Sequence, residues 1–334
     1  MIGFRGGLVY NSSRIEKENG MAVAIAYDDA KINQLRRENP GRGQASAKTP
    51  FFGSRDNPDL PHASLNHYDP GRATYSGTHF HVRDQFQVVV AGKGRIGRHD
   101  LAPYCVHFTR AYTPYGPLVT DGAGLTFMVM RAHLDEGAQH FPEALEQLKS
   151  VPDREPWQVT RSVTFPTLQS GTAAADAVLQ AVSGLTDDRG LAAYALSMKP
   201  NAAVLAPDPA RGDGQYLIVV KGSLLHHDKE HKALALVFVE PKEGPFRVHA
   251  GPQGLEALVL NFPQVKPRTE DTRAPASAAG FRKWQCMLCA FAYDEALGMP
   301  AEGVPAGTRW EDVPDTWSCP DCSASKSDFE MIEV

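Results

Sequence analysis

Four of the five cysteines of this chain lie within its last fifty residues, as the pairs Cys286-x-x-Cys289 and Cys319-x-x-Cys322. In a cytosolic protein, two pairs with this spacing indicate a tetrahedral thiolate metal site rather than disulfide bonds. The fifth cysteine, Cys105, stands alone in the strand-like stretch YCVHF, and we expect a buried strand thiol rather than a reactive one. The cysteine pattern therefore predicts a metal-binding domain at the C-terminal end of the chain.

The residues around the two pairs resemble rubredoxin over essentially all of 281–334. The matching features are the spacing of the pairs, Tyr293-Asp294, the segment PAGTRWEDVPDTW, Pro320 inside the second pair, and Lys326 with Phe329. This resemblance implies one iron, cycling between ferrous and ferric, held by Cys286, Cys289, Cys319 and Cys322. It also implies a small aromatic core around the metal, formed by Trp284, Phe291, Tyr293, Trp310, Trp317 and Phe329.

Two positions depart from the rubredoxin pattern, in which a glycine usually follows each cysteine pair. Here Ala290 and Ser323 stand at those places. If the turns require a positive φ, each substitution adds roughly 1–3 kcal/mol of strain, and altered amide hydrogen bonds to sulfur would shift the reduction potential. A zinc ion or a redox-inert iron that only stabilises the fold is the alternative, because tetrahedral thiolate sites also accept zinc.

The composition is that of a globular protein with room for two or three domains. Of its 334 residues, 42% are hydrophobic and 22% charged, no run approaches the length of a membrane span, and the N-terminus lacks a secretory leader. We therefore expect a cytoplasmic protein that does not enter membranes. The net charge of −5 arises in residues 281–334, where ten acidic side chains outnumber four basic ones, so no nucleic-acid-binding face is predicted.

A stretch of the chain repeats at an offset of 130 residues. The segment 69–94 aligns without a gap with 199–224, so that Gln85 matches Gln215 and Gly92 matches Gly222. Farther along, 116–130 matches 244–260 in the same order and nearly the same register. Several matches in one order predict a duplicated domain.

Each copy consists of short β-branched runs between Gly, Pro and Asp turns, which is typical of an all-β barrel or sandwich. Helical patterns occur only at the margins, at 28–38, 142–150 and 173–184, and we expect the last to pack outside a barrel. The predicted division is an N-terminal extension with the first barrel in 1–150, a second barrel in 151–263, a linker in 264–280, and the cysteine-rich domain in 281–334.

His79 and His81 stand two residues apart in the stretch THFHVRDQF. Residues at this spacing in a strand project to the same face, so the two imidazoles can reach one metal. The spacing His79-x-His81-x-x-x-Gln85-x6-Gly92 resembles the first cupin motif, in which two His and a Glu bind a divalent metal inside a β-barrel. With the duplication, residues 60–262 resemble a bicupin. The implied fold class is all-β, with two cupin-type barrels (double-stranded β-helices) followed by a rubredoxin-type domain.

The resemblance implies Fe(II) or another divalent metal in the first barrel, held by a set that departs from the family pattern. Gln85 stands in the place of the usual Glu, and Val119 in the place of the His of the second cupin motif. The implied ligands are His79, His81 and His107, with Gln85 on or near the metal, while His67, His99 and His133 stay open as substitutes. Cupins with three histidines bind ferrous iron and activate oxygen. In the second copy Pro209 and Arg211 replace the two histidines, so we expect no metal there.

Together the two resemblances imply a non-haem iron oxidoreductase that activates O2 in the first barrel. The rubredoxin would supply electrons for oxygenation of a small organic substrate, with a rubredoxin reductase as partner. A ring-cleaving-type dioxygenase with a structural rubredoxin site stays open, as do a redox- or ligand-sensing bicupin without turnover and a homodimer. Arg72 and Arg83, near the histidines, either bind a substrate carboxylate or are solvated at the barrel mouth.

Overall fold

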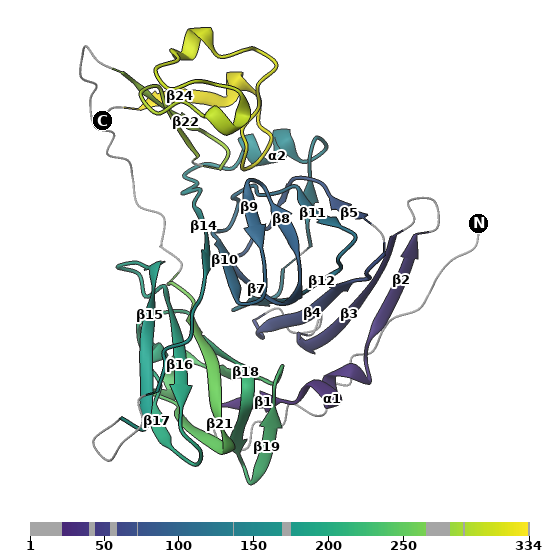
Figure 1. Cartoon of the computed structure of the whole chain (residues 1–334), viewed down its shortest axis with the longest axis vertical. Coiled ribbons are helices and arrows are strands. Elements are labelled where there is room, and N and C mark those ends of the chain that lie inside the picture. The colour runs from purple at the N-terminus through teal and green to yellow at the C-terminus, as the bar shows by residue number, and fades with distance from the viewer. Residues whose placement is uncertain are drawn as a thin grey trace.

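The computed structural model of the chain describes residues 22–39, 44–53, 59–71, 73–135, 137–168, 175–264, 281–289 and 291–332. Arg72, Ala290, the first 21 residues and 265–280 of the predicted linker lie outside the described residues. The first barrel lies between the second barrel at one end and the cysteine-rich part at the other (Figure 1). The all-β fold class is confirmed. Within the described ranges the α-helices are α1 (Tyr27–Lys31) and α2 (Leu145–Lys149), and no helix is long and apolar enough to cross a membrane.

The first barrel consists mainly of two antiparallel sheets, with an apolar core between them that includes Val89, Phe127, Ile96 and Leu118. The larger sheet has the order β14-β10-β7-β12-β4-β3-β2 and the smaller one β5-β11-β8-β9, while β6 pairs with β13. The strands are β2 (Leu35–Asn39), β3 (Gln44–Phe52), β4 (His62–Tyr68), β5 (Ala73–Ser76), β6 (His79–Phe80), β7 (Gln85–Gly92), β8 (Gly94–Ile96), β9 (His99–Leu101), β10 (Cys105–Thr109), β11 (Leu118–Asp121), β12 (Leu125–Arg131), β13 (Gln139–His140) and β14 (Gln158–Ser162).

The second barrel is built around a sheet with the order β1-β20-β18-β21-β16-β15, to which β17 and β19 add at its edges. Its strands are β1 (Val23–Ile25), β15 (Ala177–Thr186), β16 (Ala192–Met198), β17 (Ala203–Leu205), β18 (Gln215–His226), β19 (Lys229–Lys232), β20 (Leu236–Val239) and β21 (Arg247–Asn261). Two strands cross the boundary drawn at residue 150. β1 pairs with β20 of the second barrel, and β14 pairs with β10 of the first.

The strand registers of the two barrels repeat at the predicted offset of 130 residues. Leu125 of β12 pairs with Gly92 of β7, and Leu255 of β21 pairs with Gly222 of β18. Each pair of strands also has a register shift at the same place, one step further along. A bulge is a positioned feature of a sheet rather than a random defect, so its repetition supports the bicupin interpretation.

A close contact between glycines repeats as well. At Gly92, φ is +83° and an added β-carbon would lie 2.1 Å from the carbonyl oxygen of Gly124. At Gly222, φ is +72° and the corresponding distance to the oxygen of Gly254 is also 2.1 Å. Only glycine fits either position, which explains why both survive the duplication.

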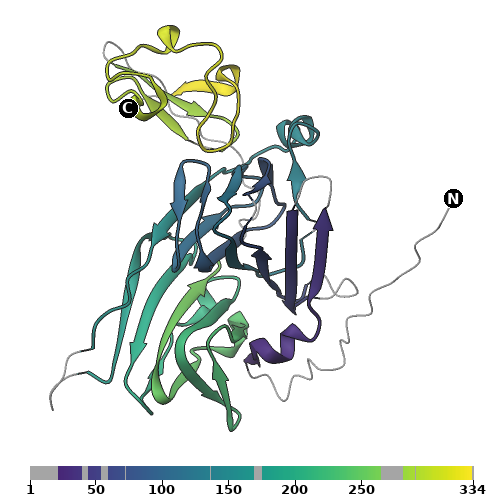
Figure 2. The same cartoon turned by 45° about the vertical axis from the view of Figure 1, so that its right-hand side comes forward.

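The two barrels pack against each other through the outer faces of their large sheets. Phe86 and Phe108 of the first barrel share one buried core with Tyr216 and Phe262 of the second, and the Phe86 and Phe262 rings lie 5.1 Å apart. Figure 2 shows the two barrels in contact, with the cysteine-rich part beyond the first barrel. Because strand residues alternate between faces, Gln85 and the other odd-numbered residues at the start of β7 project into the first barrel instead.

Two of the three helical predictions are corrected by the structure. The segment 28–38 is helical only up to Lys31 and forms strand β2 from Leu35 onward. The helix predicted at 173–184 is wrong, because the part from Ala177 onward belongs to strand β15. β15 pairs with β16 and buries Val182 and Leu185 in the core between the barrels. Pairing and burial there outweigh the helix propensity of its Ala and Leu residues. The segment 142–150 contains α2, as predicted.

The cysteine-rich part is a three-stranded sheet in which a long connection, 295–328, joins the last two strands. Its order is β23-β22-β24, with β22 (Lys283–Cys286), β23 (Ala292–Asp294) and β24 (Phe329–Ile332). The predicted aromatic core is present: Trp284 stacks on Trp310 at 5.1 Å, and Phe329 lies 4.9 Å from Trp310.

Candidate metal and ligand sites

The four predicted cysteine ligands converge on one point. Cys286 Sγ lies 3.7 Å from Cys322 Sγ, Cys289 Sγ lies 3.5 Å from Cys319 Sγ, and all four sulfurs lie within 4.8 Å of one another. Thiolates bound at about 2.3 Å to one tetrahedral metal ion stand about 3.8 Å apart, so the four sulfurs fit a single ion. Among the described residues, no other three His, Cys, Asp or Glu side chains form so compact a group.

The turn after the second cysteine pair has a positive φ at the position where rubredoxins usually have glycine and this chain has serine. Ser323 has φ of +60°, and its N–H donates a hydrogen bond of 2.7 Å to Cys319 O. A serine at positive φ is strained where glycine would not be. Ala290, at the equivalent place after the first pair, lies outside the described residues. Cys105 is a buried thiol on β10, as predicted, and burial raises its pKa.

The cysteine-rich part packs against the first barrel through one continuous buried core. Cys286, Leu288 and Cys289 share this core with Phe80 of β6 and with Leu148 of α2. Phe80 is fully buried and points away from the barrel interior, because it alternates with the two neighbouring histidines of the strand. The cysteines themselves are at most 2% exposed. The first barrel therefore contributes to keeping water away from the metal site.

Two arginines from the barrel side hold the turns of the two cysteine pairs, and we call them the clamp arginines. Arg154 donates from Nη2 to Met287 O at 3.0 Å and from Nη1 to Leu288 O at 3.4 Å, inside the first pair. Arg98 Nε lies 2.8 Å from Asp321 Oδ1, inside the second pair. Each cysteine turn thus has one guanidinium cation beside it.

His79 and His81 project into the interior of the first barrel with their tautomers fixed by outer partners. His79 Nδ1 donates to Gly77 O at 2.8 Å, and His81 Nδ1 donates to Asp135 Oδ2 at 2.6 Å. Burial and the neighbouring His81 lower the pKa of His79 to about 3, and burial and Arg131 lower the pKa of His81. Both rings are therefore neutral and present an Nε2 lone pair to the interior, as metal-binding histidines do.

Tyr115 fills the space beside His79. Its hydroxyl donates to His79 Nε2 at 3.0 Å and accepts hydrogen bonds from Gln85 Nε2 and from Gln87 Nε2. Burial raises the pKa of Tyr115 well above its usual range, so the phenol stays protonated. The predicted ligand Gln85 is thus close to His79, but its amide nitrogen is bound to Tyr115.

Arg131 fills the space beside His81. Its Nη2 donates to Gln85 Oε1 at 2.6 Å and lies 3.3 Å from His81 Nε2. Burial opposes ionisation of Asp135, but the hydrogen bond from His81 and the charge of Arg131 outweigh it and lower the pKa of Asp135 to about 2. Arg131 and Asp135 lie 3.9 Å apart. In this arrangement a guanidinium cation lies 3.3 Å from the nitrogen that a divalent ion would have to bind, so the residues as placed do not fit that ion.

His107 lies on β10 at the edge of this network. Its Nδ1 is bonded to Thr160 Oγ1 at 2.8 Å and its Nε2 to Thr109 Oγ1 at 3.2 Å, while its ring centroid is 5.3 Å from that of Tyr115. Burial lowers the pKa of His107 to about 3. A metal at His79, His81, Gln85 and His107 stays a prediction, and Arg131, which sequence reasoning missed, is the residue that opposes it.

The remaining histidines kept open as ligands lie apart from one another. His67 Nδ1 is bonded to Thr126 Oγ1 at 2.7 Å, and His99 lies 4.0 Å from Asp321. His133 Nε2 forms a 2.8 Å ion pair with Asp213, which joins the two barrels. None of the three is part of a compact ligand group among the described residues.

The second barrel replaces the charged network with a neutral one. Gln215, the counterpart of Gln85, donates to Asn261 Oδ1 at 2.9 Å and to Pro207 O at 2.8 Å. Pro209 and Arg211 form the short helix η3 (Pro209–Arg211) where the first barrel has its histidines. The absence of a metal from this barrel stays a prediction.

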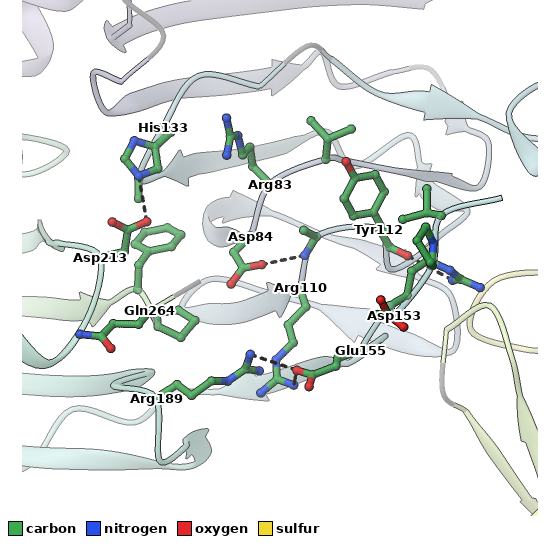
Figure 3. A pocket seen from close by; sticks show the side chains of 18 residues that line it. Arg83, Asp84, Arg110, Tyr112, His133, Asp153, Glu155, Arg189, Asp213 and Gln264 are labelled. Atoms are coloured by element: carbon green, nitrogen blue, oxygen red, sulfur yellow. Dashed lines mark hydrogen bonds and ion pairs between the residues drawn. The ribbon is translucent and has the colours of Figure 1, made fainter. Parts of the chain in front are cut away.

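A pocket of about 470 Å³ opens where the first barrel, the second barrel and the segment 151–155 meet, and we call it the junction pocket (Figure 3). Arg83 lines it together with Arg110, Arg154 and Arg189. Except for Arg83, sequence reasoning missed these residues, because they come from distant segments that carry no motif.

Two duplicated antiparallel barrels with a buried four-thiolate site on an appended small sheet define a bicupin with a C-terminal iron-binding domain. The rubredoxin family profile matches residues 283–329. Rubredoxin-2 of Pseudomonas aeruginosa is 70% identical over 53 residues, which are 16% of this chain and 96% of that protein. The rubredoxin of Acinetobacter baylyi is 60% identical over 53 residues, 16% of this chain and 98% of that protein. Through its C-terminal domain, the chain belongs to the rubredoxin family.

The barrels are similar to solved structures only at low sequence identity. A candidate dioxygenase from Nostoc punctiforme has a TM-score of 0.50 and 12% identity, covering 77% of this chain and 88% of that one. Oxalate decarboxylase from Bacillus subtilis has a TM-score of 0.48 and 12% identity, covering 73% and 78%. The first likeness supports the barrel fold and nothing finer.

Proposed function

We propose that this chain is an iron-dependent oxidoreductase in which the rubredoxin domain delivers electrons to a reaction on the side of the first barrel. The observation that carries the proposal is the docking of the cysteine site. Both cysteine turns are held by clamp arginines from the barrel side, and the core around Cys286 continues into Phe80 of β6. A rubredoxin that served only external partners would not need its metal-binding turns packed against the same chain.

When bound, the iron supplies one-electron chemistry between its ferric and ferrous states. The chain's own residues keep the site dry and link it to the barrel. Arg154, which binds the first cysteine turn, also donates to Tyr112 O at 3.5 Å, and the Tyr112 N–H donates to His81 O at 2.7 Å. A continuous series of bonded groups therefore connects the metal-binding turn with the backbone of His81, which directly follows β6.

The test compares two single cysteine variants of the full chain. We expect the iron-loaded protein to be red when oxidised and to bleach with NADPH and a rubredoxin reductase. In the presence of small organic acids, reductase-dependent oxygen uptake should fall to background in Cys319→Ser. It should persist in the control Cys105→Ser, which changes a buried cysteine outside the metal site. A protein with zinc as its metal, or equal oxygen uptake in the two variants, would contradict electron delivery by this domain.

A narrower second function, oxygen activation by ferrous iron in the first barrel, is favoured by the fixed tautomers of His79 and His81. Oxygen activation at this place requires Arg131 to move away from His81. The main proposal is therefore stated without it and does not depend on it. Replacing both histidines by alanine should remove one metal per chain and leave the rubredoxin colour intact. Unchanged metal content in that double variant would exclude the barrel iron and leave electron transfer elsewhere, or a sensing role, to account for the fusion.

A further inference from the structure

We propose that the junction pocket is a binding site for a small organic anion, with a carboxylate at one end and an apolar body. Its volume of about 470 Å³ lies within the range of about 300–1,000 Å³ that is usual for small-molecule sites. Such sites also occur preferentially between domains. Arginine and apolar side chains both line the pocket, and in Figure 3 Arg110 and Arg189 lie close together while Arg83 lies apart from them.

Arg110 and Arg189, which lie side by side in the wall, are held by carboxylates. Arg110 lies 3.0 Å from Asp187 and 3.5 Å from Glu155, and Arg189 lies 3.0 Å from the same Glu155 carboxylate. These pairs hold both guanidinium groups in place. Arg110 Nε is nevertheless buried with no hydrogen-bond partner in the described part of the chain. The Nε itself is covered, with the Arg110 guanidinium stacked over Trp157 at 5.3 Å, so a ligand carboxylate would meet the outer edges of these two fixed, planar guanidinium groups.

The pocket lining has as many carboxylates as arginines, four of each, so the pairing of the individual groups decides what the pocket can bind. Three of the acidic residues that line it are engaged: Glu155 with two arginines, Asp213 with His133 at 2.8 Å, and Asp84 with the Ala111 N–H at 2.7 Å. Within the described ranges no ion pair holds Arg83, so its guanidinium is open to a ligand carboxylate, while Arg154 already uses both Nη atoms on backbone carbonyls.

The rest of the lining fixes the kind of anion. Val82, Tyr112, Phe262 and Pro263 contribute apolar surface to the same pocket. An inorganic anion would leave this surface in contact with water, whereas an aromatic or aliphatic acid would cover it. The shape and chemistry thus match a monocarboxylic acid with a ring or short chain.

Arg154 places this ligand next to the rubredoxin domain, because it lines the pocket and also donates to Met287 O in the first cysteine turn. That the bound acid is the substrate rests on the proposed function. The inference that the acid binds is independent of the proposed function, because binding needs no electron transfer and should be the same in zinc-loaded protein.

The experiment is calorimetric titration of the full chain, in its iron-loaded and zinc-loaded forms, with benzoate, phenylacetate and the uncharged analogue benzamide. At least one acid should bind, and benzamide should bind at least about tenfold more weakly, a difference of about 1.4 kcal/mol. Arg83→Gln should weaken acid binding by a similar factor. Arg95→Gln changes an exposed arginine of β8 that does not line the pocket and should have no effect.

Three results would overturn the anion site: no heat with either acid, equal binding of benzamide and benzoate, or equal weakening by Arg83→Gln and Arg95→Gln. Failure of the proposed function gives a different pattern, in which the acid binds with the expected dependence on Arg83 but oxygen uptake never depends on Cys319. In that case the pocket stands as a ligand site of a non-catalytic protein.

Discussion

Removing the charge of Arg131 should make the interior of the first barrel a much better metal site. Arg131 Nη2 lies 3.3 Å from His81 Nε2, and a metal bound to that nitrogen would lie about 2.1 Å from it. By geometry the ion would then be at most about 5.4 Å from Arg131 Nη2, whatever its direction from the ring. Two positive charges on the ion and one on the guanidinium repel at that distance by at least about 6 kcal/mol, with an effective dielectric constant of about 20.

A penalty of that size corresponds to roughly four orders of magnitude in affinity. We therefore expect Arg131→Met, which keeps an unbranched stem but removes the charged guanidinium, to bind Co(II) far more tightly than the parent chain. The variant should also lose some free energy of unfolding, because Gln85 Oε1 and His62 Nδ1 each lose a donor. Metal binding should restore part of that loss, since the ion binds only the folded barrel.

The assay is a Co(II) titration of protein whose cysteine site already carries iron, followed by the visible bands of the cobalt ion. His79→Ala in the Arg131→Met background is the control and should abolish the gain. Equal affinity in the parent and in Arg131→Met would show that Arg131 moves away at no cost, which would refute the electrostatic reasoning. A gain that survives His79→Ala would place the metal elsewhere, and Arg131→Lys, which keeps the charge, should show no gain.

Three further predictions follow from contacts in the barrels and at the rubredoxin domain. Replacing the clamp arginines Arg98 and Arg154 by alanine should lower the midpoint potential measured by spectroelectrochemistry, because cations favour the more negative reduced site; Arg95→Ala should leave it unchanged. Gly92→Ala should lower the free energy of unfolding in urea several times more than Gly71→Ala. Both glycines have positive φ, but only at Gly92 would the new β-carbon clash, at 2.1 Å from Gly124 O. Equal losses in the two variants would refute the clash. The hydrogen bond from His133 to Asp213 raises the pKa of His133. The stabilisation of the folded chain by this contact should therefore be present below about pH 6.5 and lost as the pH rises through the higher folded pKa. At these partly exposed positions it should amount to less than about 1 kcal/mol, and His133→Ala should remove this part of the pH dependence of the free energy of unfolding.

The cysteine site could be predicted from the sequence because its ligands lie in two local turns whose spacing sets their geometry. The repeat at 130 residues was equally visible in the sequence. Its glycines recur because they make close backbone contacts that only glycine tolerates, as Gly92 and Gly222 show. The strand β15 was not visible. Its Ala-rich sequence favours a helix, and only its pairing with β16, which has no local signal, overrides that preference.

The interior of the first barrel was predictable only in part. That His79 and His81 share a face follows from the strand period, and their inward direction is observed. Arg131 lies 46 residues after Gln85 along the chain, and the contact between them depends on the pairing of β7 with β12. The junction pocket was hidden for the same reason, because seven separate segments of the chain, between Val82 and Gln264, create it together.

The two barrels share a buried pair of matching positions, which includes a charged side chain in the first barrel and only neutral side chains in the second. In the second barrel Gln215 bonds to Asn261, so the interior stays neutral. In the first, Gln85 bonds to Arg131 at the matching position 130 residues earlier. A buried cation costs several kcal/mol unless its partners are excellent, yet Arg131 lies 3.9 Å from Asp135, and its Nε has no partner in the described part of the chain. The neutral pair of the second barrel shows that the fold does not need this charge. A charge that the fold does not need is better explained by binding or catalysis, so the Arg131→Met experiment decides whether the guanidinium blocks a metal site or is itself the working group of the first barrel.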